Sequence, residues 1–587
     1  MRIKHFFGLA VLAAMTASCS SNNELVVGGG NGSGENESGV SYASFSINLP
    51  TTSGTRADDD PTFDKGDATE YDVFNATLLV FKKPTTETSE GKYTFVESVD
   101  LGSMEPWKNP NETGVTTQAK ITAKLKNVDK NGNYFALVLL NNGSGADAKV
   151  NLPTEVTTTY SAWNKADNAT DKFAKTDKGF YMANAPLFKD NSVTTLVAID
   201  KNKIFPTEAQ ASSGEAAADI YVERGLAKVT LTAATKDKKT VDASSSYAGD
   251  EVTISNWALD VTNKKTFPIH NVDGLTTDYP EIWKNEAPAT GAPSTPSTQR
   301  FVDNSKATAK RVYWGTDPNY KETNLSAETP ESKKARTENF YYIEDEKKDL
   351  TAKPTDPLYC LENTFNLTNM LQGQTTRVVF KGTYIPKSIT PDENGTFYKI
   401  GKNVALWNSE DLKKHILAAV TKVVADASAE GASTTITLNG SDNDLTTAGN
   451  RMLKASNITV KKATGDVVTL QTEDVQAIND KLGLSEGYGI STYEKGESYY
   501  IARIKHFGDA LTPWTSGVYG TNNFAYLGRY GMLRNNWYEL DVKSVSGPGY
   551  PEVPDVKPNT PDDEDDEYIK VSVNILDWAK RSQNVYL

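Results

Sequence analysis

The chain has 587 residues, a net charge of −14 and a pI of about 5.1. This length exceeds one ordinary hydrophobic core and predicts two to four domains. An acidic surface repels phosphate backbones, and no basic patch with interleaved aromatic residues offsets it, so the composition argues against a nucleic-acid partner. Plentiful Tyr, Thr and Val favour strands, while 41 Gly and 25 Pro supply turns, so a mainly β fold is predicted.

The N-terminus is predicted to be a signal peptide, residues 1–18, because Arg2 and Lys4 precede an apolar run too short to span a bilayer. Cys19 follows small residues, as at a lipoprotein cleavage site, so lipidation of Cys19 is predicted; an ordinary signal peptide with a chance cysteine is the alternative. Residues 20–38 are rich in Gly, Ser and Asn, which is typical of a flexible tether. Any attachment to a membrane would then depend on the lipid alone.

The first predicted strand shows clean period-2 alternation and ends before Pro50. Its apolar positions are Ala43, Phe45, Ile47 and Leu49. The following residues, 51–60, are small and polar and include one arginine, Arg56. A loop of this kind is where proteases cut.

The middle of the chain predicts further strands and a few helices. Residues 77–81 and 134–140 are continuous apolar runs, typical of strands buried on both faces, and residues 129–132 are typical of a hairpin turn. Residues 220–231 predict one long strand or a strand pair. A helix is predicted to begin near Asn408 and Ser409, with an apolar face of Leu412, Ile416, Ala419, Val420 and Val423; a second covers 472–482, with Gly483 as its C-cap.

The C-terminal part begins with residues 552–567, which are Pro-rich and then strongly acidic and predict a solvated, extended linker. The next segment alternates again and predicts a detached amphipathic strand, with apolar positions Ile569, Val571, Val573 and Ile575, followed by Trp578. From the residues alone, the alternative is that this strand and the first one are permanent members of a sheet.

The sequence contains no pattern that points to catalysis. The four histidines are far apart, and no zinc, calcium or phosphate-binding spacing occurs, so no metal or cofactor is implied and an enzyme is not expected. Residues 483–487 match GxSxG, but a nucleophile elbow needs a preceding strand and here a helix is predicted.

Cys360 lies in an apolar run and is interpreted as a buried structural thiol. The aromatic cluster could stack sugars, although a β-domain core is the favoured interpretation of Phe524, Tyr526, Tyr530, Trp537 and Tyr538.

The order of these features resembles the type V fimbrillins of Bacteroidetes, and most closely the shaft subunits of the short, or minor, Porphyromonas fimbriae. Residues 222–229 (VERGLAKV) are similar to the Val-Glu-Arg-x-x-Ala-Lys-Val segment of fimbrillins. The similarity to shaft subunits is carried by residues 359–364, 383–386, 530–540 and 573–578.

This resemblance implies two tandem transthyretin-like β-sandwich domains, with a few short helices in the second. The implied organisation is a lipidated propeptide with the first strand at 19–56, an N-terminal domain at 57–238, a C-terminal domain at 239–551, a linker at 552–567 and a donor strand at 568–587. An arginine-specific protease would cut between Arg56 and Ala57.

The resemblance also implies a structural subunit of an adhesive, virulence-associated cell-surface fimbria. The palmitate-bearing precursor would cross the periplasm to the outer membrane, and after the cut the terminal strand of one copy would replace the first strand of another. Implied partners are other copies of the chain, accessory anchor and tip subunits, the protease and host or bacterial surface receptors. The alternatives are an anchor or tip subunit, and a surface lipoprotein that binds glycans and does not polymerise.

Overall fold

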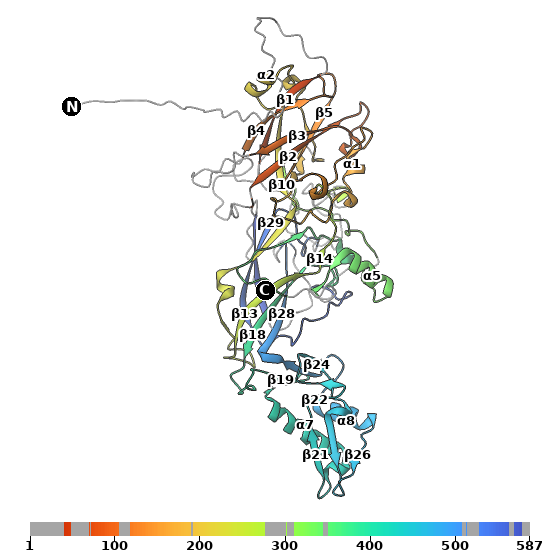
Figure 1. Cartoon of the computed structure of the whole chain (residues 1–587), viewed down its shortest axis with the longest axis vertical. Coiled ribbons are helices and arrows are strands. Elements are labelled where there is room, and N and C mark those ends of the chain that lie inside the picture. Colours follow the sequence, from red (N-terminus) through yellow and green to blue (C-terminus); the bar gives the residue numbers. More distant parts are fainter. Residues whose placement is uncertain are drawn as a thin grey trace, which may run out of the picture.

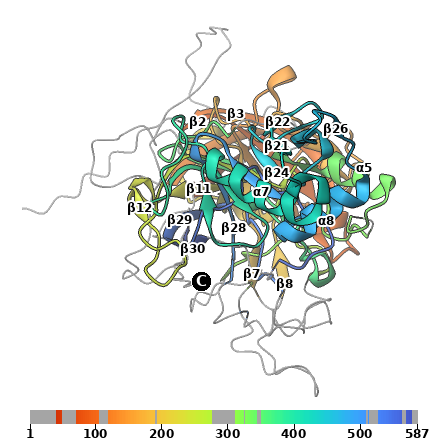
Figure 2. The same cartoon turned by 90° about the horizontal axis from the view of Figure 1, so that it is seen from below.

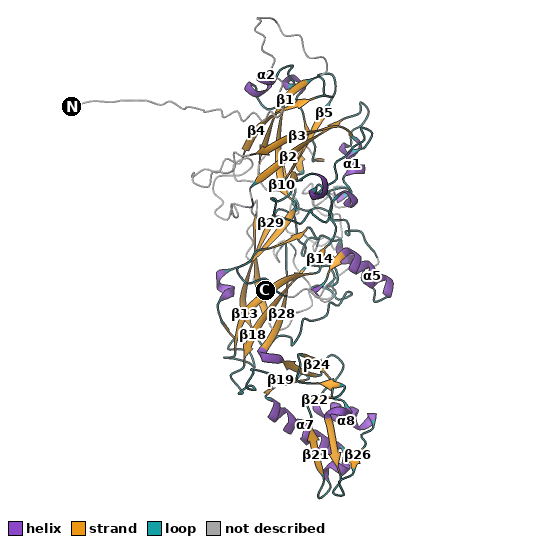
Figure 3. Ribbon diagram, viewed as in Figure 1, coloured by secondary structure: helices purple, strands orange, loops and turns teal. Residues whose placement is uncertain are grey.

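The computed structural model describes residues 40–48, 70, 72–104, 118–189, 192–275, 301, 310–323, 325–343, 350–507, 512, 527–562 and 569–577. Figure 1 shows a long molecule with an N-terminal unit at one end, a C-terminal unit in the middle and a small lobe at the other end. Strands dominate and helices are short (Figure 3), so the predicted mainly β fold is confirmed.

The N-terminal unit is built on an eight-stranded sheet with the order β3-β2-β5-β6-β10-β1-β4, in which β9 also pairs with β5. The strands are β1 (Ser41–Asn48), β2 (Val73–Lys82), β3 (Thr94–Met104), β4 (Gln118–Leu125), β5 (Tyr134–Leu140), β6 (Met182–Asn184), β9 (Val197–Ala198) and β10 (Ala218–Arg224). Two short helices, α1 (Tyr160–Trp163) and α2 (Glu208–Ser213), lie against this sheet. A smaller sheet joins β15 (Lys310–Arg311), β7 (Leu187–Lys189) and β8 (Ser192–Thr194).

Strands β2 and β5 are buried on both faces, as their continuous apolar runs predict. Leu78 and Val80 point into one hydrophobic cluster, whereas Leu79 and Phe81 point into another. The hairpin predicted at residues 129–132 is wrong: Asp129 does close a turn by accepting hydrogen bonds from the backbone of the next residues, but β4 and β5 on either side pair with other strands.

The C-terminal unit contains two four-stranded sheets. One has the order β17-β11-β29-β30 and comprises β17 (Leu358–Leu361), β11 (Leu226–Leu231), β29 (Asn536–Val545) and β30 (Ile569–Asp577). The other has the order β12-β13-β18-β28 and comprises β12 (Lys239–Thr240), β13 (Glu251–Asp260), β18 (Arg377–Ile385) and β28 (Glu497–Arg503). A single core draws Val229, Tyr538 and Leu540 from the first sheet and Trp257, Phe380 and Tyr500 from the second, which is the arrangement of a β-sandwich. Helix α5 (Pro330–Asn339) runs into β16 (Phe340–Tyr341), which pairs with β14 (Thr262–Asn263).

The small lobe is inserted between β18 and β28, which remain paired with each other. It contains β19 (Phe397–Ile400), β20 (Leu406–Trp407), α7 (Ser409–Val423), β21 (Ser433–Ile436), β22 (Asn439–Gly440), β23 (Asn443–Asp444), β24 (Gly449–Arg451), β25 (Ile458–Lys461), β26 (Val467–Val468), α8 (Thr472–Leu482) and β27 (Ile490–Tyr493). Both predicted helices are confirmed: Asn408 caps α7 by accepting from the Asp411 amide, and Gly483 ends α8 with a φ of 74°. The lobe has its own hydrophobic core, to which the predicted apolar face of α7 contributes.

The first passage of the chain from the N-terminal to the C-terminal unit takes a single residue, Gly225. Strand β10 ends just before this glycine in the N-terminal sheet, and β11 begins just after it in a C-terminal sheet. A Cβ at Gly225 would lie 2.6 Å from the ring of Phe173, so the crossing requires glycine. Residues 220–231 therefore form two strands that do not pair, and the domain boundary predicted after residue 238 lies later than the change of sheet.

Candidate functional site

The first strand lies in the interior of the N-terminal sheet. β1 pairs in parallel with β10 and antiparallel with β4, and the backbone of Tyr42 exchanges two hydrogen bonds with that of Phe205. Ala43, Phe45 and Ile47 are fully shielded from water, in agreement with the predicted alternation. Leu49 lies outside the described residues, as do Cys19, Arg56 and Ala57. Because β1 has a partner on each side, its removal would leave a strand-shaped groove with two open ladders.

The polar face of β1 is also buried, which the alternation did not predict. Ser44 is 1% exposed and donates to the Ala211 carbonyl of α2 over 2.6 Å, and its hydroxyl lies 2.8 Å from that of Thr122. Burying Phe45 and Ile47 stabilises the strand by roughly 1.5–3 kcal/mol each. In the uncut chain, both faces of β1 therefore contribute to holding it in the sheet.

The last described strand is not detached, so that prediction is wrong. β30 pairs antiparallel with β29, with Val573 opposite Leu540 and Ile575 opposite Tyr538, and Figure 2 shows the two strands side by side. On its other edge β29 pairs with β11, so β30 forms the outer strand of this sheet. Trp578 lies outside the described residues.

The predicted linker is packed against the C-terminal unit over its first part. Asp562 is only 2% exposed; it accepts a hydrogen bond from the Thr375 hydroxyl and lies 3.7 Å from a guanidinium nitrogen of Arg503. The Thr560 carbonyl accepts from the Gln372 amide over 2.9 Å. Residues 552–562 are therefore partly packed rather than fully solvated, although Glu552, Asp555, Lys557 and Asn559 are exposed; the rest of the acidic run lies outside the described residues.

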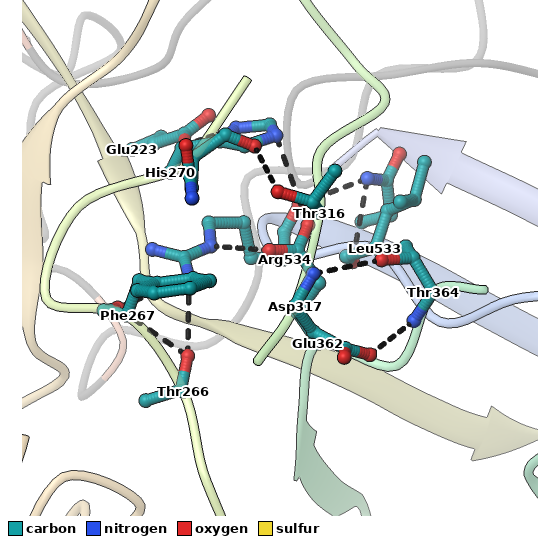
Figure 4. Close-up of polar contacts among 12 residues, drawn as sticks. Glu223, Thr266, Phe267, His270, Thr316, Asp317, Glu362, Thr364, Leu533 and Arg534 are labelled. Carbon is teal, nitrogen blue, oxygen red and sulfur yellow. Dashed lines mark hydrogen bonds and ion pairs between the residues drawn. The ribbon is translucent and has the colours of Figure 1, made fainter. Parts of the chain in front are cut away.

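The segment 222–229 forms a charged joint between the two units (Figure 4). Glu223 on β10 is buried, with an oxygen 2.8 Å from His270 Nδ1 and another 3.4 Å from Arg311. His270 Nε2 lies 3.8 Å from Glu362, which in turn accepts from Arg534 Nε over 3.1 Å. Burial raises the pKa of Glu223, but the charges of His270, Arg311 and Arg534 outweigh burial and leave the pKa below its usual value.

A second group of buried charges surrounds Glu70. Lys228 and Glu70 form a salt bridge of 2.7 Å, and the Tyr359 hydroxyl donates to the same carboxylate over 2.7 Å. The Arg224 guanidinium donates to the Glu70 carbonyl with two nitrogens at 3.1 Å, and the Lys228 ammonium lies 3.9 Å from the centre of the Trp537 ring. In the sequence this motif is visible only as a resemblance; a further signal is that Glu223, Arg224 and Lys228 lie close together between the apolar residues Val222, Leu226, Ala227 and Val229.

The other predicted candidates do not form an open site among the described residues. Tyr530 and Tyr538 are buried, and Trp537 donates to the Thr230 hydroxyl, which fits a core; Phe524 and Tyr526 lie outside the described part. Cys360 is buried, and burial raises the pKa of its thiol to about 12. Within the part of the chain that the structure describes, no group of three or more His, Cys, Asp or Glu residues could hold a metal ion, and no helix has the length and apolarity to span a membrane.

Comparison with known proteins gives one family match. Residues 491–584 match the family model described as major fimbrial subunit protein type IV, fimbrillin, C-terminal. The matched region includes β28, β29 and β30. No curated protein matches the chain. The match supports a fimbrillin family and, with it, a structural subunit of a cell-surface fimbria rather than an enzyme.

Proposed function

We propose that the chain is the precursor of a fimbrial shaft subunit that polymerises by strand exchange. In this proposal β1 fills its own groove until the chain is cut between Arg56 and Ala57. The terminal strand β30 of a second copy then takes the place of β1. The precursor is lipidated at Cys19 and attached to the outer membrane, and anchor and tip subunits complete an adhesive fimbria.

The observation that carries the proposal is the position of β1 between β10 and β4. A strand with partners on both edges leaves a groove when it departs, and a groove with open backbone groups recruits an extended segment from another chain. Before the cut, the covalent link gives β1 a high effective concentration at the groove, which blocks a competing strand. After the cut, this advantage is lost.

The second strand fits the same groove in length and pattern. β1 has eight residues and β30 has nine, and both alternate apolar and polar positions. Each copy would donate β30 and accept the β30 of another copy. A head-to-tail contact of this kind does not close on itself, so it yields filaments.

The test uses precursor without residues 1–19, treated with an arginine-specific protease and followed by gel filtration and electron microscopy. The expected result is filaments from the cut protein and monomers from Arg56→Ala, with loss of residues 20–56 from the filaments. A form that ends at Asp562 should be cut but remain monomeric. Filaments from this shortened form, or monomers from the cut full-length chain, would contradict strand exchange.

A further inference from the structure

The segment before β30 is held to the C-terminal unit at successive points. The backbones of Tyr550 and Tyr499 exchange two hydrogen bonds of 2.8 Å, and the Pro554 carbonyl accepts from Arg377 over 2.6 Å. Pro558 packs closely against Gly373. A Cβ atom added to Gly373 would lie only 2.6 Å from the Cα of Pro558. Thr560 and Asp562 provide two further contacts.

Asp562 is the most strongly fixed of these points. Its side chain is fully shielded, contacts the Thr375 hydroxyl and faces Arg503, and its carbonyl accepts from the Tyr530 hydroxyl at 3.5 Å. A buried carboxylate with a basic partner is costly to separate from it. Residues 563–568, the leash, connect this fixed point to β30; they lie outside the described residues and number six, against the sixteen of the predicted linker, 552–567.

Six residues give β30 a short reach. Seven residue steps separate Asp562 from Ile569, so the start of β30 stays within about 25 Å of Asp562. Because Asp562 is buried, the chain uses part of this length to reach the surface of its own subunit. The groove that β30 would enter lies inside the sheet of another molecule. While residues 554–562 stay packed, this short reach restricts the movement of β30 into that groove.

We propose that residues 554–562 form a latch, closed by Asp562, which keeps β30 on its own β29 and must open before β30 enters another copy. This inference rests on the proposed function. Opening the latch back to Tyr550 lengthens the connection between β30 and the nearest fixed point from six residues, 563–568, to 18 residues, 551–568. Since loop closure scales as the −3/2 power of length, the effective concentration of β30 at its own β29 falls about fivefold.

A disulfide that locks the latch tests the proposal. In Thr375→Cys/Asp562→Cys, the two new thiols replace side chains that are in direct contact. After the arginine-specific cut, the oxidised protein is expected to remain monomeric and the reduced protein to form filaments; each single variant controls for loss of the original side chain. Equal filament formation by the oxidised and reduced forms would overturn the latch.

A longer leash provides the matched rescue. Twelve Gly and Ser residues inserted after Asp565 lengthen the leash of the oxidised double variant to 18 residues, and filament formation is expected to return. Failure of this rescue would show that the disulfide acts by some route other than reach, and would overturn the proposal.

Hydrogen exchange separates the latch from the proposed function, because it needs only uncut monomer. Amides of β29 and β30 are expected to exchange about fivefold faster in the reduced double variant than in the oxidised one. Equal exchange overturns the latch even if filaments form. If wild type forms no filaments but this difference is present, strand exchange fails and the latch stands.

Discussion

The carboxylate of Glu70 lies 2.7 Å from the ammonium of Lys228, and both side chains are almost completely shielded from water. Glu70 precedes β2 in the N-terminal unit, whereas Lys228 lies on β11 in the C-terminal unit. The pair therefore ties the two units together next to the crossing at Gly225. The contribution of this pair to stability is clearest when one partner is removed, because the remaining charge stays buried without a counter-charge.

Replacing Lys228 by Met should lower the free energy of unfolding by about 3–5 kcal/mol, since Glu70 loses its counter-charge. The double variant Glu70→Gln/Lys228→Met should recover part of this loss. Urea unfolding checks both. The matched control is Lys178→Met, which breaks an exposed pair with Asp147 and should leave the midpoint unchanged; a similar loss in both lysine variants would contradict the assignment.

The charged joint should also make stability depend on pH. The pKa of Glu223 is lower in the folded chain than its ordinary value of 4.5, so the unfolded chain binds more protons in this range. The stabilisation is present above about pH 4.5 and is lost as the pH falls through the folded pKa. Glu223→Gln should flatten the acid limb of the unfolding free energy between pH 3 and pH 6, and an unchanged slope would argue against the joint as its source.

Gly225→Ala should destabilise the chain, because the added methyl group meets the Phe173 ring at 2.6 Å and the Tyr181 ring at 3.1 Å. Overpacking of this kind costs typically about 1–3 kcal/mol. Phe173→Leu removes the nearer ring and should restore part of the loss in the double variant. Additive losses in a double-mutant cycle, measured by thermal unfolding, would show that the two residues are not coupled.

Cys360 should be inert in the folded chain and reactive only after unfolding. Burial raises the pKa of its thiol to about 12, so the thiolate that attacks alkylating reagents is scarce at pH 8. Iodoacetamide should label the urea-unfolded chain but not the native one, as read by mass spectrometry of precursor without residues 1–19. Rapid labelling of native protein would contradict a buried thiol.

Local signals in the sequence predicted several elements well. The apolar run 134–140 predicts a strand and forms β5, Asn408 marks the start of α7, and Gly483 marks the end of α8. These features depend on neighbouring residues: an apolar run, a side-chain cap and a positive φ. The apolar positions of β1 are buried for the same reason.

Features that depend on distant partners were not predicted. The small lobe contains strands of two to four residues, too short for a periodic signal, so it was not recognised as a separate unit. Asp562 stands in an acidic run, and only its packing against Thr375 and Arg503 shows that it is buried. Likewise, nothing in the alternation of β30 indicates whether its partner is β29 of the same chain or a groove in another.

The crossing at Gly225 has a mechanical consequence for a filament built by the proposed exchange. A strand in the place of β1 lies alongside β10, and β10 continues through this one residue into β11, which pairs with β29. Tension along the filament would therefore pass from one subunit to the next through a nearly uninterrupted backbone. The hydrogen bonds of each ladder would be loaded together in shear, and the charged joint would keep the crossing from acting as a loose hinge under pull.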